Sequence, residues 1–175
     1  MKTLVTGGTR SGKSAVAEAQ LEADSAAVYI ACGPSSDDHD WNERIRIHKE
    51  RRPATWSTLE TTDLVGALAG LESPALIDCL GTWLTAHLDD LNAWERPVES
   101  FADDLRARLE ALASAVAACE QPLVIVTNEV GQSLISMDRS GRIFTDWLGW
   151  TNQAVAAACD RVLLVVAGCT LVVKD

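Results

Sequence analysis

The sequence predicts an α/β fold in which a doubly wound, mostly parallel sheet has helices on both faces. Short apolar runs typical of buried strands alternate along the chain with longer segments of helical periodicity. A glycine-rich loop that contains a lysine joins the first apolar run to the first helical segment. A later apolar run ends in an aspartate, and ligands bind where the strands of such a sheet end.

Length and composition limit the alternatives. The chain has 175 residues, enough for one core, so we expect a single nucleotide-binding domain over residues 1–175. Apolar residues make up 47% of it, which argues against disorder. No apolar run approaches the roughly 18–20 residues that span a bilayer, and the glycines come too early for a signal peptide. We therefore expect a cytoplasmic protein without stable membrane insertion. The net charge of −10 argues against nucleic acid as a partner.

The predicted elements follow from local signals. Continuous apolar runs predict the strands, and good helix formers bounded by capping residues or proline predict the helices. The predicted strands are Lys2–Thr6, Ala26–Ala31, a short Thr55–Leu59, Ala75–Asp78, Leu123–Thr127, Arg161–Val166 and Leu171–Val173. The predicted helices are Gly12–Ala23, Asp40–Arg51, Asp63–Leu71, Cys79–Leu91, Val98–Cys119 and Gly141–Cys159. The last two strands are close enough in sequence to form a hairpin at the sheet edge. The five cysteines have no metal-ligand spacing, and we expect buried free thiols.

The glycine-rich loop fits the phosphate-binding pattern G-x-x-x-x-G-K-[ST]. It consists of Gly7, Gly8, Thr9, Arg10, Ser11, Gly12, Lys13 and Ser14. Glycines let the backbone N–H groups point at phosphate oxygens, Lys13 adds a mobile positive charge, and the Ser14 hydroxyl suits Mg²⁺. The alternative is a turn that binds nothing, and the strand and helix on either side argue against it. We expect this loop to bind GTP or ATP.

Asp78 ends the apolar run Ala75–Asp78 in the form of a Walker B strand, whose carboxylate approaches the Mg²⁺ of a bound nucleotide. Many buried strands end in aspartate, so the pattern gains weight only beside a phosphate-binding loop. We expect Mg²⁺ as the cofactor, with Ser14 and Asp78 as its protein ligands. Glu129 also follows a strand, and it is expected either to act as a base or indirect metal partner, or to be structural.

A basic helical segment contains His48. On a helix, Arg44, His48 and Arg52 lie one above another, with Arg51 beside them. Several guanidinium groups would lower the pKa of His48, favour the neutral nucleophile and hold a polyphosphate against it. The alternative is a solvated basic face with a surface histidine. His39 and His87 are expected to be structural, and His87 has no basic neighbour on its own helix.

Several ordered motifs resemble one family over nearly the whole chain. They are Leu4–Ser14, Tyr29–Ala31, Arg44-Ile45-x-x-His48 with Arg52-Pro53, Trp56-x-Thr58-x-Glu60, Asp78-Cys79-Leu80-x-Thr82-Trp83, Val126–Gly131, Asn152-Gln153, Gly168 and Lys174. The chain resembles the bifunctional adenosylcobinamide kinase / adenosylcobinamide-phosphate guanylyltransferase family of cobalamin biosynthesis. The segment after Gly131 departs from the family pattern, in which a glycine and a proline usually follow.

The resemblance implies a function and a set of site residues. It implies a P-loop domain of RecA-like fold and a homo-oligomer of trimeric type. The partners it implies are GTP or ATP together with adenosylcobinamide and its phosphate. His48 would be the catalytic residue that becomes covalently guanylylated. The implied nucleotide contacts, besides Gly7 to Ser14, are Cys32, Gly33, Pro34, Lys49, Glu50, Arg51, Arg52, Glu60 and Asp78.

Two other functions stay open at this point. The first is a kinase of another small molecule, with the basic helix as a lid over the donor phosphates and no covalent nucleotide. The second is a nucleotide-dependent regulatory protein that signals by ordering its loops.

Overall fold

The structure is a computed structural model that describes residues 1–21, 26–33 and 53–175. Within these residues a seven-stranded sheet has the order β3-β2-β4-β5-β1-β6-β7. The strands are β1 (Lys2–Gly7), β2 (Val28–Ala31), β3 (Ser57–Glu60), β4 (Ala75–Asp78), β5 (Leu123–Val126), β6 (Arg161–Val166) and β7 (Cys169–Lys174). All neighbours are parallel except β6 and β7, which form an antiparallel hairpin at one edge. The predicted mostly parallel α/β sheet and its terminal hairpin are confirmed.

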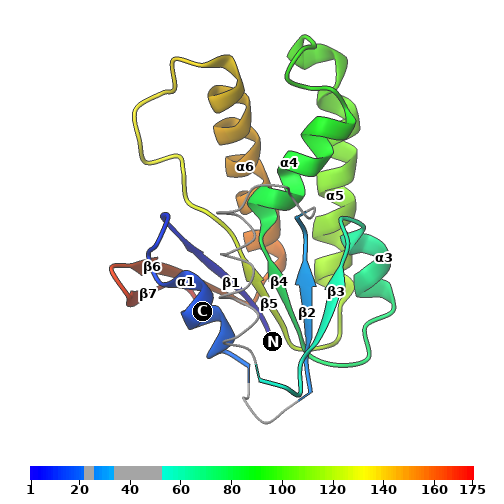
Figure 1. Cartoon of the computed structure of the whole chain (residues 1–175), viewed down its shortest axis with the longest axis vertical. Coiled ribbons are helices and arrows are strands. Elements are labelled where there is room, and N and C mark those ends of the chain that lie inside the picture. The colour runs from blue at the N-terminus through cyan, green and yellow to red at the C-terminus, as the bar shows by residue number, and fades with distance from the viewer. Residues whose placement is uncertain (22–25, 34–52) are drawn as a thin grey trace.

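Helices cover both faces of the sheet (Figure 1). They are α1 (Lys13–Glu18), α3 (Leu64–Ala69), α4 (Leu80–Asp90), α5 (Ala102–Ala118) and α6 (Arg139–Ala158), with the short 3₁₀ helix η1 (Val98–Ser100). One buried cluster joins the sheet to α3, α4, α5 and α6, and a smaller one joins its other face to α1. No helix among the described residues is long and apolar enough to cross a membrane.

Several predicted boundaries shift. The helix predicted from Val98 begins at Ala102, because Val98–Ser100 forms a 3₁₀ turn in which the Ser100 hydroxyl donates to the Pro97 carbonyl. The first helix is shorter than Gly12–Ala23, and α6 begins two residues before the predicted Gly141. The predicted helix Asp40–Arg51 lies outside the described residues.

The cysteines are free thiols, as predicted, but not all of them are buried. Cys32, Cys119 and Cys159 are buried, Cys79 is half-buried and Cys169 is exposed on the edge strand β7. We expected burial because cysteine has apolar character. Every residue of the edge strand β7 is exposed, however, so no other element of the described structure covers Cys169.

Three helices extend beyond the edge of the sheet at which its parallel strands end. Figure 1 shows α4 continuing away from the end of β4, and α5 and α6 returning toward the sheet. With 11 residues, α4 has a length of about 16 Å. The side chain of Arg139, at the start of α6, donates to the carbonyls of Ala93, Trp94 and Arg96 and so ties α6 to the connection between α4 and α5. Helices α4, α5 and α6 therefore lie beside the strand ends, and Arg139 fixes α6 to the connection between α4 and α5.

Candidate nucleotide-binding site

The loop after β1 has the closely packed backbone that a phosphate-binding loop needs. Gly12 has φ +96°, a conformation that L side chains rarely adopt, and it leads directly into α1. At Gly7 a Cβ atom would lie 2.5 Å from the backbone oxygen of Val165 on the neighbouring strand β6. The Ser11 N–H donates to the Gly8 carbonyl at 3.3 Å and closes the turn. Two of the glycines are thus required by geometry, one by its φ angle and one by contact.

The side chains of this loop lie against its own backbone. The Lys13 ammonium donates to the Gly8 carbonyl at 3.2 Å, so it lies over the loop. The Ser11 hydroxyl is buried and has no hydrogen-bond partner within the described residues. Ser14 is half-buried at the second residue of α1, while Thr9 and Arg10 are exposed. The loop therefore brings the Lys13 ammonium and the Ser11 and Ser14 hydroxyls together near the N-terminus of α1, and such groups bind phosphates.

The turn between β6 and β7 supports the phosphate-binding loop from the far end of the chain. The Gly168 N–H donates to the Ser11 carbonyl at 2.8 Å. A Cβ atom at Gly12 would lie 3.4 Å from the Gly168 Cα atom, so the two glycines pack closely. The sequence signal was Gly168 within the family motifs, but its contact with the loop is not a local property and was not predicted.

Asp78 and Glu60 lie in one row at the same edge of the sheet. Glu60 pairs in register with Ala31, Ala31 with Asp78, Asp78 with Val126 and Val126 with Val5. Neighbours in register point to one face. That face is the one covered by α1, because Leu76, two residues before Asp78, belongs to the α1 cluster. The predicted carboxylates therefore share an edge and a face with the phosphate-binding loop.

The spacing of strands separates these carboxylates. Strand β5 lies between β1 and the strand of Asp78, so Asp78 is about 10 Å from the β1 axis at a spacing of about 4.8 Å per strand. Glu60 is four strands from β1, about 19 Å by the same spacing. Asp78 is positioned by the hydroxyl of Tyr29, which donates to its Oδ2 atom at 2.7 Å. Asp78 is thus two strands from the phosphate-binding loop, whereas Glu60 is four strands from it.

The exit of β5 is held by α6. The buried Thr127 hydroxyl donates to Oδ1 of Asn152 at 2.6 Å, and Nδ2 of Asn152 donates to the Asn128 carbonyl at 3.0 Å. Next along the chain, the Glu129 N–H donates to the Gly7 carbonyl at 3.1 Å. Asn152 therefore positions the strand that lies beside the phosphate-binding loop. In the sequence Asn152 stood out only within the family motif Asn152-Gln153, which gave no sign of this contact.

The remaining predicted site residues divide into two groups. Pro34, His48, Lys49, Glu50, Arg51 and Arg52 lie outside the described residues. Cys32 and Gly33 follow β2, and the Cys32 N–H donates to the Asp78 carbonyl at 3.2 Å. The Cys32 side chain is fully buried on the face opposite α1, and this burial, with the nearby Cys79 and Asp78, raises the pKa of its thiol. Any nucleotide contact at Cys32 would involve its backbone.

His87 has a basic neighbour after all. Nη1 of Arg108, on α5, lies 2.8 Å from Nδ1 of His87, and the ring of Trp83 lies against the imidazole with centroids 4.3 Å apart. Burial lowers the pKa of His87, and the Arg108 charge lowers it further. The neighbour comes from a different helix, so the helical spacing around His87 gave no sign of it.

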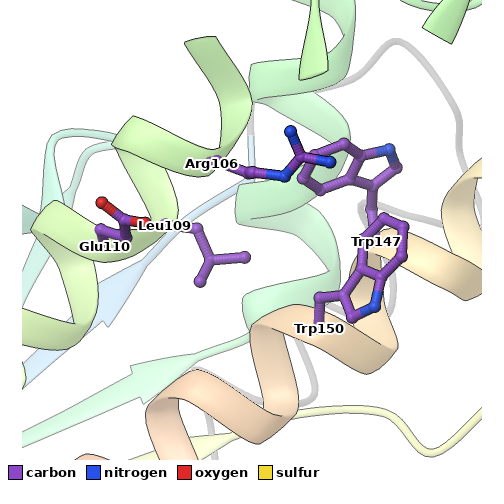
Figure 2. A pocket seen from close by; sticks show the side chains of 5 residues that line it. All are labelled: Arg106, Leu109, Glu110, Trp147 and Trp150. Atoms are coloured by element: carbon purple, nitrogen blue, oxygen red, sulfur yellow. The ribbon is translucent and has the colours of Figure 1, made fainter. Parts of the chain in front are cut away.

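A cavity of about 390 Å³ lies elsewhere, between α5 and α6 (Figure 2). Its lining residues are Arg106, Leu109, Glu110, Trp147 and Trp150. The Trp147 ring is buried and meets Trp150 edge-on with centroids 4.8 Å apart, and the Arg106 guanidinium lies 5.9 Å from the Trp147 centroid. No residue of the phosphate-binding loop lines this cavity, and its contacts are those of helix packing.

The predicted Mg²⁺ ligands fit the ion chemically. Mg²⁺ prefers oxygen ligands and usually takes only one or two from the protein, the rest being water and substrate phosphates. A hydroxyl at Ser14 and a carboxylate at Asp78, both half-buried and both near the same edge, make such a donor set. Among the described residues no three or more His, Cys, Asp or Glu side chains gather in a group that could hold a metal ion.

Comparison with known proteins identifies the family of this chain. A family model described as cobinamide kinase / cobinamide phosphate guanyltransferase matches residues 3–173. The chain belongs to this family of enzymes. It is 36% identical over 99% of its length to the bifunctional adenosylcobalamin biosynthesis protein CobU of Escherichia coli (strain K12), all of which is covered. It is 37% identical over 99% of its length to all of the protein of the same name from Salmonella typhimurium. The CobP protein of Pseudomonas aeruginosa is 36% identical, with 99% of this chain and 98% of that protein covered.

Among solved structures, the P4 protein from bacteriophage phi6 in complex with ADP is similar, with a TM-score of 0.41 and 15% sequence identity. The match covers 97% of this chain and 53% of that chain. This score is too low to indicate a common fold by itself, so the P-loop α/β assignment depends on the strand order and the loop geometry described above.

Proposed function

We propose that this protein is a two-activity enzyme that phosphorylates adenosylcobinamide and then transfers GMP from GTP to adenosylcobinamide phosphate. The product of the second step is adenosylcobinamide-GDP. The observation that supports this most strongly is a closely packed phosphate-binding loop in a chain that matches the family over residues 3–173. The full coverage of relatives named as bifunctional supports both activities in one chain.

In the kinase step, the loop amides and Lys13 hold the donor phosphates while the γ-phosphoryl group passes to the terminal hydroxyl of the aminopropanol arm of the acceptor. The charge that spreads over the transferring group is stabilised by Lys13 and by the N-terminus of α1. Ser14 and Asp78 would hold Mg²⁺, which neutralises phosphate charge when it is bound.

In the transferase step, neutral His48 attacks the α-phosphorus of GTP and pyrophosphate leaves. A phosphate oxygen of adenosylcobinamide phosphate then attacks the same phosphorus, and the bond from phosphorus to the histidine nitrogen breaks. The cations at Arg44, Lys49, Arg51 and Arg52 favour an unprotonated imidazole and hold the triphosphate. Division of the transfer into two displacements predicts ping-pong behaviour.

The location of Glu60 on β3 supports a second nucleotide-binding site, separate from the phosphate-binding loop. About 19 Å across the sheet from β1, its carboxylate is too far away to contact phosphates held by the loop. A guanine or a ribose hydroxyl placed near β3, in contrast, lies within its reach. Glu60 thus fits the nucleotide of the transferase step better than the donor of the kinase step.

The covalent step is tested with GTP radiolabelled at the α-phosphate. We expect acid-labile, base-stable label on the wild-type protein and none on His48→Ala, because a phosphoramidate breaks in acid and survives base. His39→Ala serves as a matched control and keeps the label. Equal labelling of the wild type and His48→Ala contradicts the covalent step, and phosphoryl transfer to cobinamide without any protein label reduces the function to that of a kinase.

We also propose that the protein forms a homo-oligomer of trimeric type. Sedimentation equilibrium of the purified protein measures the mass directly. A mass equal to the 18.8 kDa of one chain contradicts it.

A further inference from the structure

The loop between β5 and α6 exposes a concentrated apolar surface. Leu134, Ile135 and Met137 have 95%, 84% and 93% of their surface exposed. These are the three most exposed large apolar side chains among the described residues. Since burying such a side chain is favourable, a group of three held in solvent marks a surface that binds an apolar partner. We call residues 132–137 the apolar loop.

The apolar loop is held in place by hydrogen bonds at both ends. At its start the Gly131 N–H donates to Oε1 of Glu129 at 2.8 Å. At its end Arg142, in the first turn of α6, donates to the carbonyls of Ser136 and Met137 at 3.0 and 2.7 Å. The exposed side chains therefore extend from a backbone whose two ends are fixed by hydrogen bonds.

The apolar loop begins beside the phosphate-binding loop. The Glu129 N–H, two residues before Gly131, donates to the Gly7 carbonyl. Figure 1 shows the loop rising from the end of β5, beyond the edge at which the phosphate-binding loop lies. An acceptor that receives a phosphoryl group at the phosphate-binding loop must place the rest of its body on an adjoining surface, and the apolar loop is one such surface.

The chemistry of the apolar loop matches a large macrocycle with apolar faces. Residues 130–137 contain no charged side chain in a chain that is 23% charged. Gln132, Ser133 and Ser136 offer hydrogen bonds among the apolar side chains. A corrin ring presents methyl-rich faces and peripheral amides, so it is matched in both respects, and the sulfur-containing side chain of Met137 adapts easily to an irregular surface.

We propose that Leu134, Ile135 and Met137 form an apolar surface that binds the corrin ring of the acceptor and so contributes to the enzyme's specificity for that acceptor. The proposal rests on the proposed function and names the part of the chain that binds its acceptor. It requires no contact between this loop and the nucleotide.

The test is equilibrium binding of dicyanocobinamide, measured by quenching of tryptophan fluorescence in the presence of a non-hydrolysable ATP analogue. The variants are Leu134→Ser and Ile135→Ser, with Leu171→Ser as control. Leu171 is also a strongly exposed leucine, at 62%, but lies on the edge strand β7. Because these side chains are exposed, the variants keep the wild-type melting temperature. We expect the Kd for cobinamide to rise about tenfold in each loop variant, which corresponds to about 1.4 kcal/mol. The control keeps the wild-type Kd.

Two further measurements decide the meaning of the result. The Kd for the nucleotide, measured by calorimetry, stays unchanged in the loop variants if the loop binds only the acceptor. The mass in solution also stays unchanged, whereas a shift in mass assigns the loop to contact between copies of the chain and overturns the proposal. An unchanged Kd for cobinamide in both loop variants overturns it too, as does an equal loss in Leu171→Ser.

The outcome for the wild type separates this inference from the proposed function. If the wild type neither binds nor phosphorylates cobinamide, the proposed function fails and the inference fails with it. If the wild type does both and the loop variants bind equally well, the inference alone fails.

Discussion

The contact at Gly7 leads to a quantitative prediction for Gly7→Ala. The added Cβ atom would lie 2.5 Å from the Val165 carbonyl oxygen and 2.6 Å from the Ser11 hydroxyl oxygen. The hydroxyl can rotate, but the carbonyl belongs to β6, which pairs with β1 from Thr3 to Gly7, so relief requires movement of a paired strand. Overpacking of this kind costs about 1–3 kcal/mol. A chain of this size loses about 2–4 °C in melting temperature per kcal/mol, so we expect a decrease of about 4–8 °C for 2 kcal/mol.

Gly8 provides a matched control one residue away. A Cβ atom at Gly8 would meet nothing within 4 Å, and its φ lies outside the positive range. We expect Gly8→Ala to change the free energy of unfolding by less than about 0.5 kcal/mol. Urea unfolding followed by circular dichroism measures both variants without nucleotide, so a binding effect does not enter the comparison. Equal stability of the two variants would refute the argument that contact with β6 makes Gly7 necessary.

Two further predictions concern His87 and Glu129. Burial and Arg108 lower the pKa of His87, so the folded state binds its proton less readily than the unfolded state does. Its stabilising contribution is complete above the unfolded pKa of about 6.5 and is lost as the pH falls through the folded value. The difference in unfolding free energy between the wild type and His87→Gln should therefore shrink between pH 8 and pH 5, and a constant difference contradicts this. For Glu129, the hydrogen bond to the Gly131 N–H predicts a positioning role. Glu129→Gln keeps an acceptor oxygen and should retain kcat/KM for cobinamide phosphorylation, while Glu129→Ala should lose about tenfold, a change of about 1.4 kcal/mol. An equal loss in both variants would show that the charge itself is needed.

Local signals were enough to predict the parts of the site that are continuous in sequence. The apolar run before Gly7, the glycines and lysine that follow it, and the helix formers after Lys13 act over neighbouring residues, and the structure places them as strand, loop and helix. Asp78 at the end of β4 was predictable for the same reason. The hairpin of β6 and β7 was predictable from two apolar runs separated by only a few residues, including Gly168.

The contacts that join distant segments were not predictable. Gly168 supports Ser11 across more than 150 residues, and Asn152 holds the exit of β5 from α6. Arg108 approaches His87 from another helix. Each of these contacts depends on which strands and helices become neighbours, and periodicity along the chain contains no information about that choice.

The strand order itself has a mechanistic consequence that the sequence did not reveal. Because β5 separates β1 from β4, a nucleotide that joins the phosphate-binding loop to Asp78 must pass over the exit of β5. That exit is fixed by Asn152 and continues through Glu129 into the apolar loop. A shift of β5 would therefore move the backbone between the phosphate-binding loop and Asp78. It would also move the apolar loop proposed to bind the acceptor. The half-buried Asn152 amide, which bonds to Thr127 and Asn128, restrains β5 at the point where both surfaces meet.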